Sequence, residues 1–301
     1  MTELNEIRKV ASERIVTKTG ERIPEAAVHL DYPIGMFDSG VGGLCVLKAV
    51  MKELPRESVI YFADTARVPY GGRSPQEIVK INHEIIDYLI ECGAKLIVMA
   101  CGTSSSIAYP LVYDKYKVPI VELIVPGSRA AAAATRNGKI GVIATAGTID
   151  SGAFQREIKA IKPDAQVFAA ACPLFVPLIE GGFIEAEETR RVAKEYLKPL
   201  IKEGIDSLVL GCTHYPHLKG MIQEIVGVGV TLVDPAIEVV RDVKIALKKK
   251  GLFSSGTKAA DYTYMVSGSL PQFRQLASRL LLLPVASAKK VNLVAKKGPI
   301  E

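Results

Sequence analysis

The stretch "IECGAKLIVMACGT" at residues 90–103 has a counterpart at residues 201–214, "IKEGIDSLVLGCTH". When Cys101 is aligned with Cys212, each copy shows an apolar run that ends at a small residue followed by the cysteine. Such a run predicts a strand that is buried on both faces, as in a parallel sheet. We therefore expect both cysteines directly after the carboxyl ends of strands, in two copies of one unit.

The beginnings of the two copies match as well. "IGMFDSGVGG" from Ile34 and "IGVIATAGT" from Ile140 each place an apolar strand before a glycine-bearing turn. The separations from these starts to the cysteines are 101 − 34 = 67 and 212 − 140 = 72 residues. Amphipathic segments at residues 75–92 and 185–203 predict helices between strands. Strands that alternate with helices are typical of doubly wound α/β folds, which bind ligands outside the carboxyl ends of the strands.

The expected fold class is therefore α/β, with two similar doubly wound parallel-sheet domains related by pseudo-twofold symmetry and the active site in the cleft between them. After residue 235, a helix, a strand at "YTYMVSG" and a helix from Gln272 are expected to pack on the first copy. The predicted division is an N-terminal extension at 1–32, a first domain at 33–125 plus 235–284, a second domain at 126–234 and a basic C-terminal tail at 285–301.

Composition narrows the class of protein. The 301 residues are 49% apolar and 23% charged, which suits one large core or two medium ones. The net charge of +6 is spread over both halves, and short basic runs are usually solvated helix ends, so no nucleic-acid binding is expected. The N-terminal stretch has no apolar core of a signal peptide, and no segment approaches the roughly 20 apolar residues of a membrane span. We expect a cytoplasmic protein that does not bind membranes.

The five cysteines are odd in number, and their spacings fit neither a disulfide framework nor paired metal ligands. Free cysteines are most often small buried hydrophobic residues, which is the expectation for Cys45, Cys92 and Cys172. Cys101 and Cys212 differ because the repeat would bring them to one cleft from opposite sides. Inversion of an α-carbon needs a base on one face and an acid on the other, and a thiolate and a thiol can exchange these roles.

The residues after each cysteine predict a helix whose N-terminus stabilises a thiolate. "GTSSS" follows Cys101 and contains good N-capping residues, and Pro216, four residues after Cys212, suits the first turn of a helix. The helix dipole and the free backbone N–H groups favour the thiolate form. His214 either biases the proton of Cys212 or is a capping or buried neutral histidine.

Five ordered blocks resemble the aspartate/glutamate racemase family between Ile34 and about Gln272. They are "IGMFDSGVGGLCVLKAV", "YFADTARVPYGGRS", "VMACGTSSS", "GVIATAGTIDSGAF" with "CPLFVPLIEGG", and "LVLGCTHYPHL". "DSGVGG" alone is a weak signal, whereas the five blocks in this order are specific. The resemblance implies an isomerase that interconverts L- and D-glutamate without a cofactor or metal and supplies D-glutamate for peptidoglycan. It further implies a small-molecule substrate and a homodimer.

Carried over residue by residue, the resemblance makes Cys101 and Cys212 the catalytic acid and base. Asp38 beside Cys101 and His214 beside Cys212 would assist them, and Glu180 in "LIEGG" would be a further assisting acid. The residues implied to hold the substrate are Asp38, Ser39, Tyr70, Gly71, Gly102, Thr103, Thr213 and His214. The family pattern after the first cysteine is Cys-Asn-Thr, whereas this chain has Gly102 and therefore lacks the asparagine amide. Aspartate or a related acidic amino acid thus stays open as the substrate.

Three other hypotheses fit parts of the pattern. Cys212, His214 and His217 are zinc ligands by residue type, which metal analysis would test. A non-catalytic binding protein that keeps the racemase fold is conceivable because of Gly102, and a racemisation assay separates it from an enzyme. A racemase that uses pyridoxal phosphate would form a Schiff base with a lysine and would show a visible absorption band.

Overall fold

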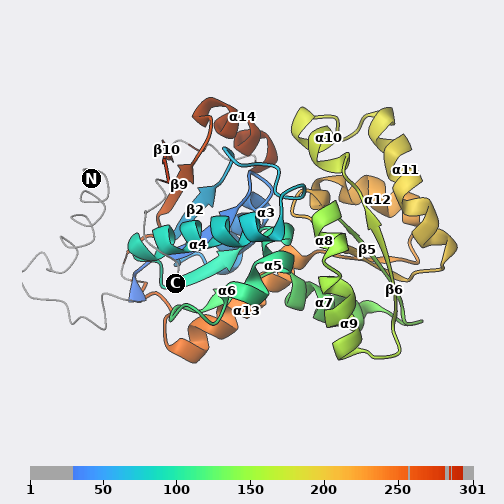
Figure 1. Ribbon diagram of the computed structural model, residues 1–301, viewed down its shortest axis with the longest axis horizontal. Coiled ribbons are helices and arrows are strands. Elements are labelled where there is room, and N and C mark those ends of the chain that lie inside the picture. The colour runs from blue at the N-terminus through green and yellow to red at the C-terminus, as the bar shows by residue number, and fades with distance from the viewer. Residues whose placement is uncertain (1–29, 257, 282–284, 286, 294–301) are drawn as a thin grey trace, which may run out of the picture.

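The computed structural model describes residues 30–256, 258–281, 285 and 287–293. Most of the predicted N-terminal extension and part of the basic tail lie outside the described residues. Figure 1 shows two lobes side by side, each built around one parallel sheet. The predicted α/β fold class is therefore confirmed.

The larger sheet has six strands and the smaller sheet has four, and every strand pair is parallel. The larger sheet has the spatial order β10 (Ala288–Lys290), β9 (Tyr262–Val266), β2 (Val59–Ala63), β1 (Ile34–Asp38), β3 (Leu96–Met99) and β4 (Ile120–Val121). The smaller sheet has the order β6 (Gln166–Ala171), β5 (Lys139–Ala144), β7 (Ser207–Leu210) and β8 (Thr231–Val233). The chain thus returns after the second lobe to extend the first sheet with β9 and β10.

Helices surround both sheets (Figure 1). Those of the first lobe are α3 (Leu44–Glu53), α4 (Pro75–Glu91), α5 (Gly102–Ile107), α6 (Tyr109–Val112), α13 (Pro235–Lys250) and α14 (Leu270–Leu281). Those of the second lobe are α7 (Ile124–Ala134), α8 (Ala146–Asp150), α9 (Ala153–Ile161), α10 (Phe175–Gly181), α11 (Glu187–Lys202), the 3-10 helix η1 (Tyr215–Leu218) and α12 (Lys219–Val226). Helix α13 packs against both α3 and α7 and so joins the lobes.

Helix α4 shows how local sequence sets these boundaries. The Ser74 hydroxyl accepts a hydrogen bond from the backbone N–H of Glu77, and the Glu77 carboxylate accepts one from the backbone N–H of Ser74. This capping box, with Pro75 in the first turn, fixes the start of the helix. The apolar residues Ile78, Ile81, Ile85, Ile86 and Leu89 recur at helical spacing and are buried.

The two sheets repeat the same strand order and the same register. The order β2-β1-β3-β4 in the first corresponds to β6-β5-β7-β8 in the second. Ile34 pairs with Leu96, and Ile140 pairs with Ser207. These partners stand equally far before the two cysteines, since 101 − 96 = 5 and 212 − 207 = 5. The cysteines therefore occupy equivalent places at the carboxyl edges of their sheets.

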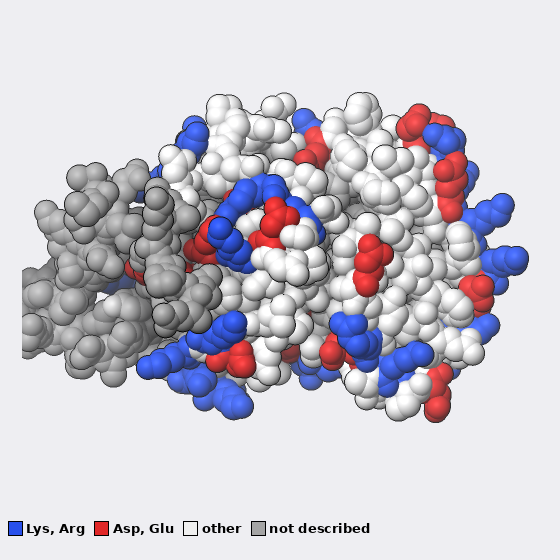
Figure 2. Space-filling view, viewed as in Figure 1, with Lys and Arg blue, Asp and Glu red and all other residues white. Residues whose placement is uncertain are grey.

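The largest cluster of buried apolar side chains contains residues of both lobes, among them Leu47, Tyr215 and Val240. On the face shown in Figure 2, basic and acidic side chains are interspersed, with uncharged surface between them. None of the helices in the described part of the chain combines the length and the apolar character that a bilayer crossing requires.

Candidate active site

Three buried side chains lie at the carboxyl ends of the central strands. Asp38 is the last residue of β1, Cys101 lies two residues after β3, and Cys212 lies two residues after β7. Cys101 and Cys212 are only 5% and 8% exposed. Because both parallel sheets end here, the carboxylate and the two thiols come from equivalent edges of the two lobes.

These edges meet at close range. The hydroxyl oxygens of Thr103 and Thr145 are 3.2 Å apart, and the first comes from the first lobe while the second comes from the second lobe. A Cβ placed on Gly42, in the turn after β1, would lie 2.4 Å from Nδ1 of His214. Glycine is therefore required at position 42 for the turn to approach the second lobe.

Cys101 lies next to an anion. Its Sγ is 3.8 Å from Oγ of Ser39. The Asp38 carboxylate accepts hydrogen bonds from the backbone N–H groups of Ser39 and Gly43, at 2.8 and 2.7 Å. Burial and the nearby charge of Asp38 raise the pKa of Cys101 to about 12. Burial also raises the pKa of Asp38, although the charge of His214 opposes this. Cys101 is therefore a thiol at neutral pH and suits the role of an acid.

Cys212 lies next to a cation. Its Sγ is 3.9 Å from Nδ1 of His214, and Nε2 of the same ring is 3.0 Å from Oε1 of Glu180. Burial opposes the charged ring, but the hydrogen bonds to Cys212 and Glu180 outweigh it and raise the pKa of His214 to about 10. His214 is therefore an imidazolium at neutral pH. The imidazolium of His214 therefore lies directly beside the Cys212 thiol.

The helix predicted after Cys212 differs from the observed one. Cys101 is the N-cap of α5, as expected. By contrast, η1 begins only at Tyr215, has four residues and is capped by His214. The carbonyl of Cys212 accepts a hydrogen bond from the N–H of Tyr215 at 3.0 Å, which is the spacing of a 3-10 turn. The positive charge beside Cys212 therefore comes from His214 and not from a helix that starts at the cysteine.

Some of the residues predicted to bind substrate lie at the interface between the lobes, and the hydroxyl of one of them is bonded elsewhere. Thr103 reaches the second lobe through Thr145, and Ser39 faces Cys101. A Cβ on Gly71 would lie 3.6 Å from Cβ of Thr145, so the turn at residues 70–71 also reaches the interface. The hydroxyl of Tyr70, however, donates to Asp64 at 2.5 Å inside the first lobe. The binding roles stay predictions.

Two side chains at this interface were not singled out from the sequence. Thr145 contacts Thr103 and lies 3.1 Å from the hydroxyl of Thr148. The repeat would have identified it, because alignment of the two strand starts pairs Ser39 with Thr145, at 39 − 34 = 5 and 145 − 140 = 5. Arg279 of α14 donates to the backbone carbonyl of Glu180 at 3.1 Å, and no local sequence pattern indicates this contact.

No group of three or more His, Cys, Asp or Glu side chains within the described ranges is arranged to hold a metal ion. This includes the suggested zinc ligands Cys212, His214 and His217. Burial, with His214 and Lys48 nearby, lowers the pKa of His217 to about 4. Its backbone N–H donates to the carbonyl of His214, which closes the turn.

The chain is similar to known racemases in sequence and in fold. Residues 45–243 match the Asp/Glu/hydantoin racemase family. A glutamate racemase of Geobacter metallireducens is 45% identical over 264 residues, which cover 88% of this chain and 98% of that protein. The crystal structure of a glutamate racemase from Bacillus anthracis has a TM-score of 0.84 at 34% identity, covering 87% of this chain and 98% of that chain. A glutamate racemase of Francisella tularensis in complex with D-glutamate has a TM-score of 0.82 at 35% identity, with 88% and 98% covered.

Proposed function

Because the chain belongs to the Asp/Glu/hydantoin racemase family and is an isomerase, we propose that it interconverts L- and D-glutamate by proton transfer between two cysteines, without a cofactor. One observation carries the proposal: two thiols lie at equivalent edges of a duplicated sheet and have opposite electrostatic surroundings. Cys101 lies next to the carboxylate of Asp38, and Cys212 lies next to the imidazolium of His214. An acid and a base on opposite sides of one carbon are what inversion requires.

With L-glutamate, the Cys212 thiolate removes the α-proton and becomes a thiol. The electron pair of the broken C–H bond stays on the α-carbon, and the Cys101 thiol delivers a proton to the opposite face. Cys101 is then a thiolate and Cys212 a thiol, which is the state that D-glutamate needs. The assignment of Cys212 to the L-enantiomer and of Cys101 to the D-enantiomer follows the family resemblance, and the groups beside the two thiols support it.

The assisting groups act on these proton transfers. Nδ1 of His214 lies beside Sγ of Cys212, and the contact with Glu180 favours the charged form of the His214 ring. Burial and the charge of Asp38 keep the proton on Cys101. When D-glutamate is the substrate, Cys101 has to lose that proton, and the ammonium group of the substrate then offsets the charge of Asp38.

Glutamate is favoured over aspartate because relatives at 45% identity over nearly their whole length are glutamate racemases. Gly102 keeps aspartate as the second candidate. The test is the circular dichroism of L-glutamate and of L-aspartate incubated separately with the protein, in the presence of EDTA and without pyridoxal phosphate. Loss of the L-glutamate signal supports the proposal. No change with L-glutamate, or activity that depends on metal or on pyridoxal phosphate, contradicts it.

The cellular role follows from the product. D-glutamate is a component of peptidoglycan, so we infer that the protein acts in the cytoplasm, supplies cell-wall synthesis and maintains cell shape. A strain that lacks the protein should then grow only with added D-glutamate. We also expect a homodimer, which light scattering of the pure protein would test.

A further inference from the structure

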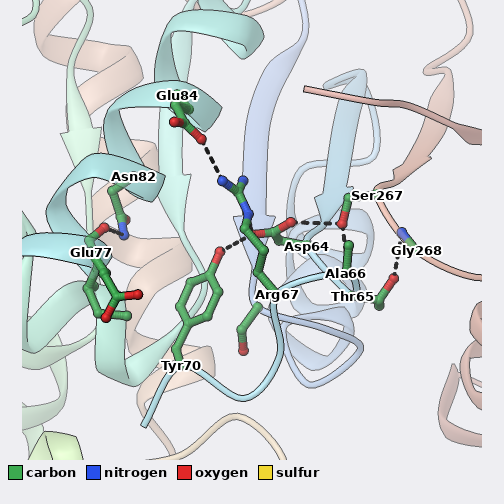
Figure 3. A network of polar contacts seen from close by, with 12 residues as sticks. Asp64, Thr65, Ala66, Arg67, Tyr70, Glu77, Asn82, Glu84, Ser267 and Gly268 are labelled. Carbon is green, nitrogen blue, oxygen red and sulfur yellow. Dashed lines mark hydrogen bonds and ion pairs between the residues drawn. The ribbon is translucent and has the colours of Figure 1, made fainter. Parts of the chain in front are cut away.

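A buried carboxylate outside the reacting centre organises the loop that leads to the predicted substrate turn. Asp64 directly follows β2 and is fully buried. Its Oδ1 accepts a hydrogen bond from the hydroxyl of Ser267 at 2.7 Å. Its Oδ2 accepts one from Nε of Arg67 at 2.7 Å and one from the hydroxyl of Tyr70 at 2.5 Å. Figure 3 shows Arg67 and Tyr70, from the loop after β2, and Ser267, from the returning chain, around Asp64.

The network extends in two directions from this carboxylate. Arg67 also contacts Oε2 of Glu84 on α4 at 2.5 Å, so one guanidinium joins two carboxylates. Ser267, which follows β9, accepts a hydrogen bond from the backbone N–H of Ala66 at 2.9 Å. The loop after β2 is therefore tied to α4 on one side and to the returning strand β9 on the other (Figure 3).

The turn at the end of this loop faces the second lobe. The ring of Tyr70 lies in the same buried apolar cluster as Cys101. Gly71 approaches Thr145, as described above. The Tyr70 hydroxyl is bonded to Asp64 inside the first lobe, whereas the backbone of Gly71 lies near Gly147 of the second lobe.

We propose that Asp64 and Ser267 are positioning residues for substrate binding: they hold the Tyr70–Gly71 turn against the second lobe, and the Tyr70 hydroxyl serves as the attachment point and not as a substrate ligand. The inference rests on the proposed function for its kinetic consequence. The turn contacts the substrate in the ground state and in the transition state alike. A variant in which the turn is less firmly held therefore loses binding free energy equally in both states. This raises KM and leaves kcat nearly unchanged.

The first test is a cycle of Asp64→Asn, Tyr70→Phe and the double variant. Asp64→Asn removes the charge and places an amide where three donors converge, so KM should rise about tenfold while kcat changes less than about threefold. Tyr70→Phe should raise KM less. Because both substitutions disrupt the same hydrogen bond, the KM of the double variant should equal that of Asp64→Asn within about twofold. If the increases in KM of the two single variants multiply in the double variant, the inference is overturned. A fall in kcat with unchanged KM also overturns it.

A matched control separates positioning from general destabilisation. Glu57 is a buried carboxylate just before β2, at the opposite end of that strand, and pairs with Lys95 at 2.6 Å. Glu57→Gln should lower thermal stability in the same way as Asp64→Asn and leave KM unchanged. An equal rise of KM in both variants contradicts the inference.

Ser267→Ala and its control Ser287→Ala test the same inference if Asp64→Asn does not fold. Ser267→Ala removes one donor to Asp64 and should raise KM about threefold. Ser287→Ala removes a hydroxyl that donates to the carbonyl of Tyr262, at the other end of β9, and should leave KM unchanged. Equal KM values for these two variants overturn the inference.

Hydrogen exchange provides a readout that needs no turnover. Backbone amides of residues 70–73 should exchange faster in Ser267→Ala than in the wild-type protein and in Ser287→Ala. An inactive wild-type protein contradicts the proposed function, and exchange then still decides the positioning role. If the wild-type protein is active but the wild type, Ser267→Ala and Ser287→Ala all exchange at the same rate, the positioning role is contradicted and the proposed function is not.

Discussion

Gly102 and Gly211 are in contact across the two lobes: a Cβ on Gly102 would lie 2.6 Å from the carbonyl oxygen of Gly211. Gly102 directly follows Cys101, and Gly211 directly precedes Cys212. Side-chain carbons in proteins essentially never approach a backbone oxygen this closely. A side chain at position 102 therefore does not fit against the backbone of Gly211, which lies beside Cys212.

Gly102→Ala should reduce kcat/KM by roughly tenfold to 100-fold. The added methyl group forces the lobes apart, and a displacement of about 1 Å at reacting groups costs on the order of 100-fold in rate. The control is Gly220→Ala in α12, where a Cβ meets no atom within 4 Å. A Gly102→Ala protein as active as Gly220→Ala would show that the close contact has no role in turnover.

His214 predicts a pH-dependent contribution to stability. Its pKa is raised from 6.5 to about 10, so the folded state holds the proton more tightly than the unfolded chain. The contribution is therefore complete below pH 6.5 and is lost as the pH rises through about 10. Urea unfolding should show that His214→Gln lowers the free energy of unfolding more at pH 6 than at pH 10.5. The same loss at both pH values would contradict the charged state of the ring.

Alkylation should distinguish the two thiols. At neutral pH, iodoacetamide should react first at Cys212, because a thiolate is the nucleophile and burial beside Asp38 disfavours the thiolate of Cys101. Cys101, whose pKa is raised to about 12, should react more slowly. Added glutamate should protect the enzyme, and His214→Gln should slow the reaction at Cys212. Peptide mass mapping gives the modified residue.

The three other cysteines provide the controls for this experiment. Cys92 and Cys172 are buried, and burial raises the pKa of both. Sγ of Cys45 donates to the carbonyl of Thr213 at 3.2 Å, a bond that a serine hydroxyl can also make. Serine at each of these positions should leave turnover largely intact. Inactivation that follows modification at one of them alone would refute the assignment of the catalytic thiols.

The sequence was informative wherever the chain repeats itself. The aligned apolar runs before Cys101 and Cys212 predicted a strand ahead of each cysteine, and β3 and β7 confirm both strands. Contacts made by the returning chain could not be predicted in this way. Ser267 reaches Asp64 across 203 residues, and no local pattern records which residues meet after so long a separation.

The central claim is that Cys101 and Cys212 face one carbon from opposite sides. Either cysteine replaced by serine should abolish racemisation, since inversion needs both groups. Elimination needs only one base. With a glutamate analogue that carries a leaving group on the β-carbon, a single thiolate removes the α-proton, the leaving group departs, and the enamine hydrolyses to a keto acid and ammonia.

The most direct measurement is therefore keto-acid formation by Cys101→Ser and Cys212→Ser from the L- and D-forms of this analogue. Cys101→Ser, which keeps Cys212, should process the L-form alone, and Cys212→Ser should process the D-form alone. If both variants process the same enantiomer, or if either variant still racemises glutamate at the wild-type rate, the two thiols do not flank a common carbon.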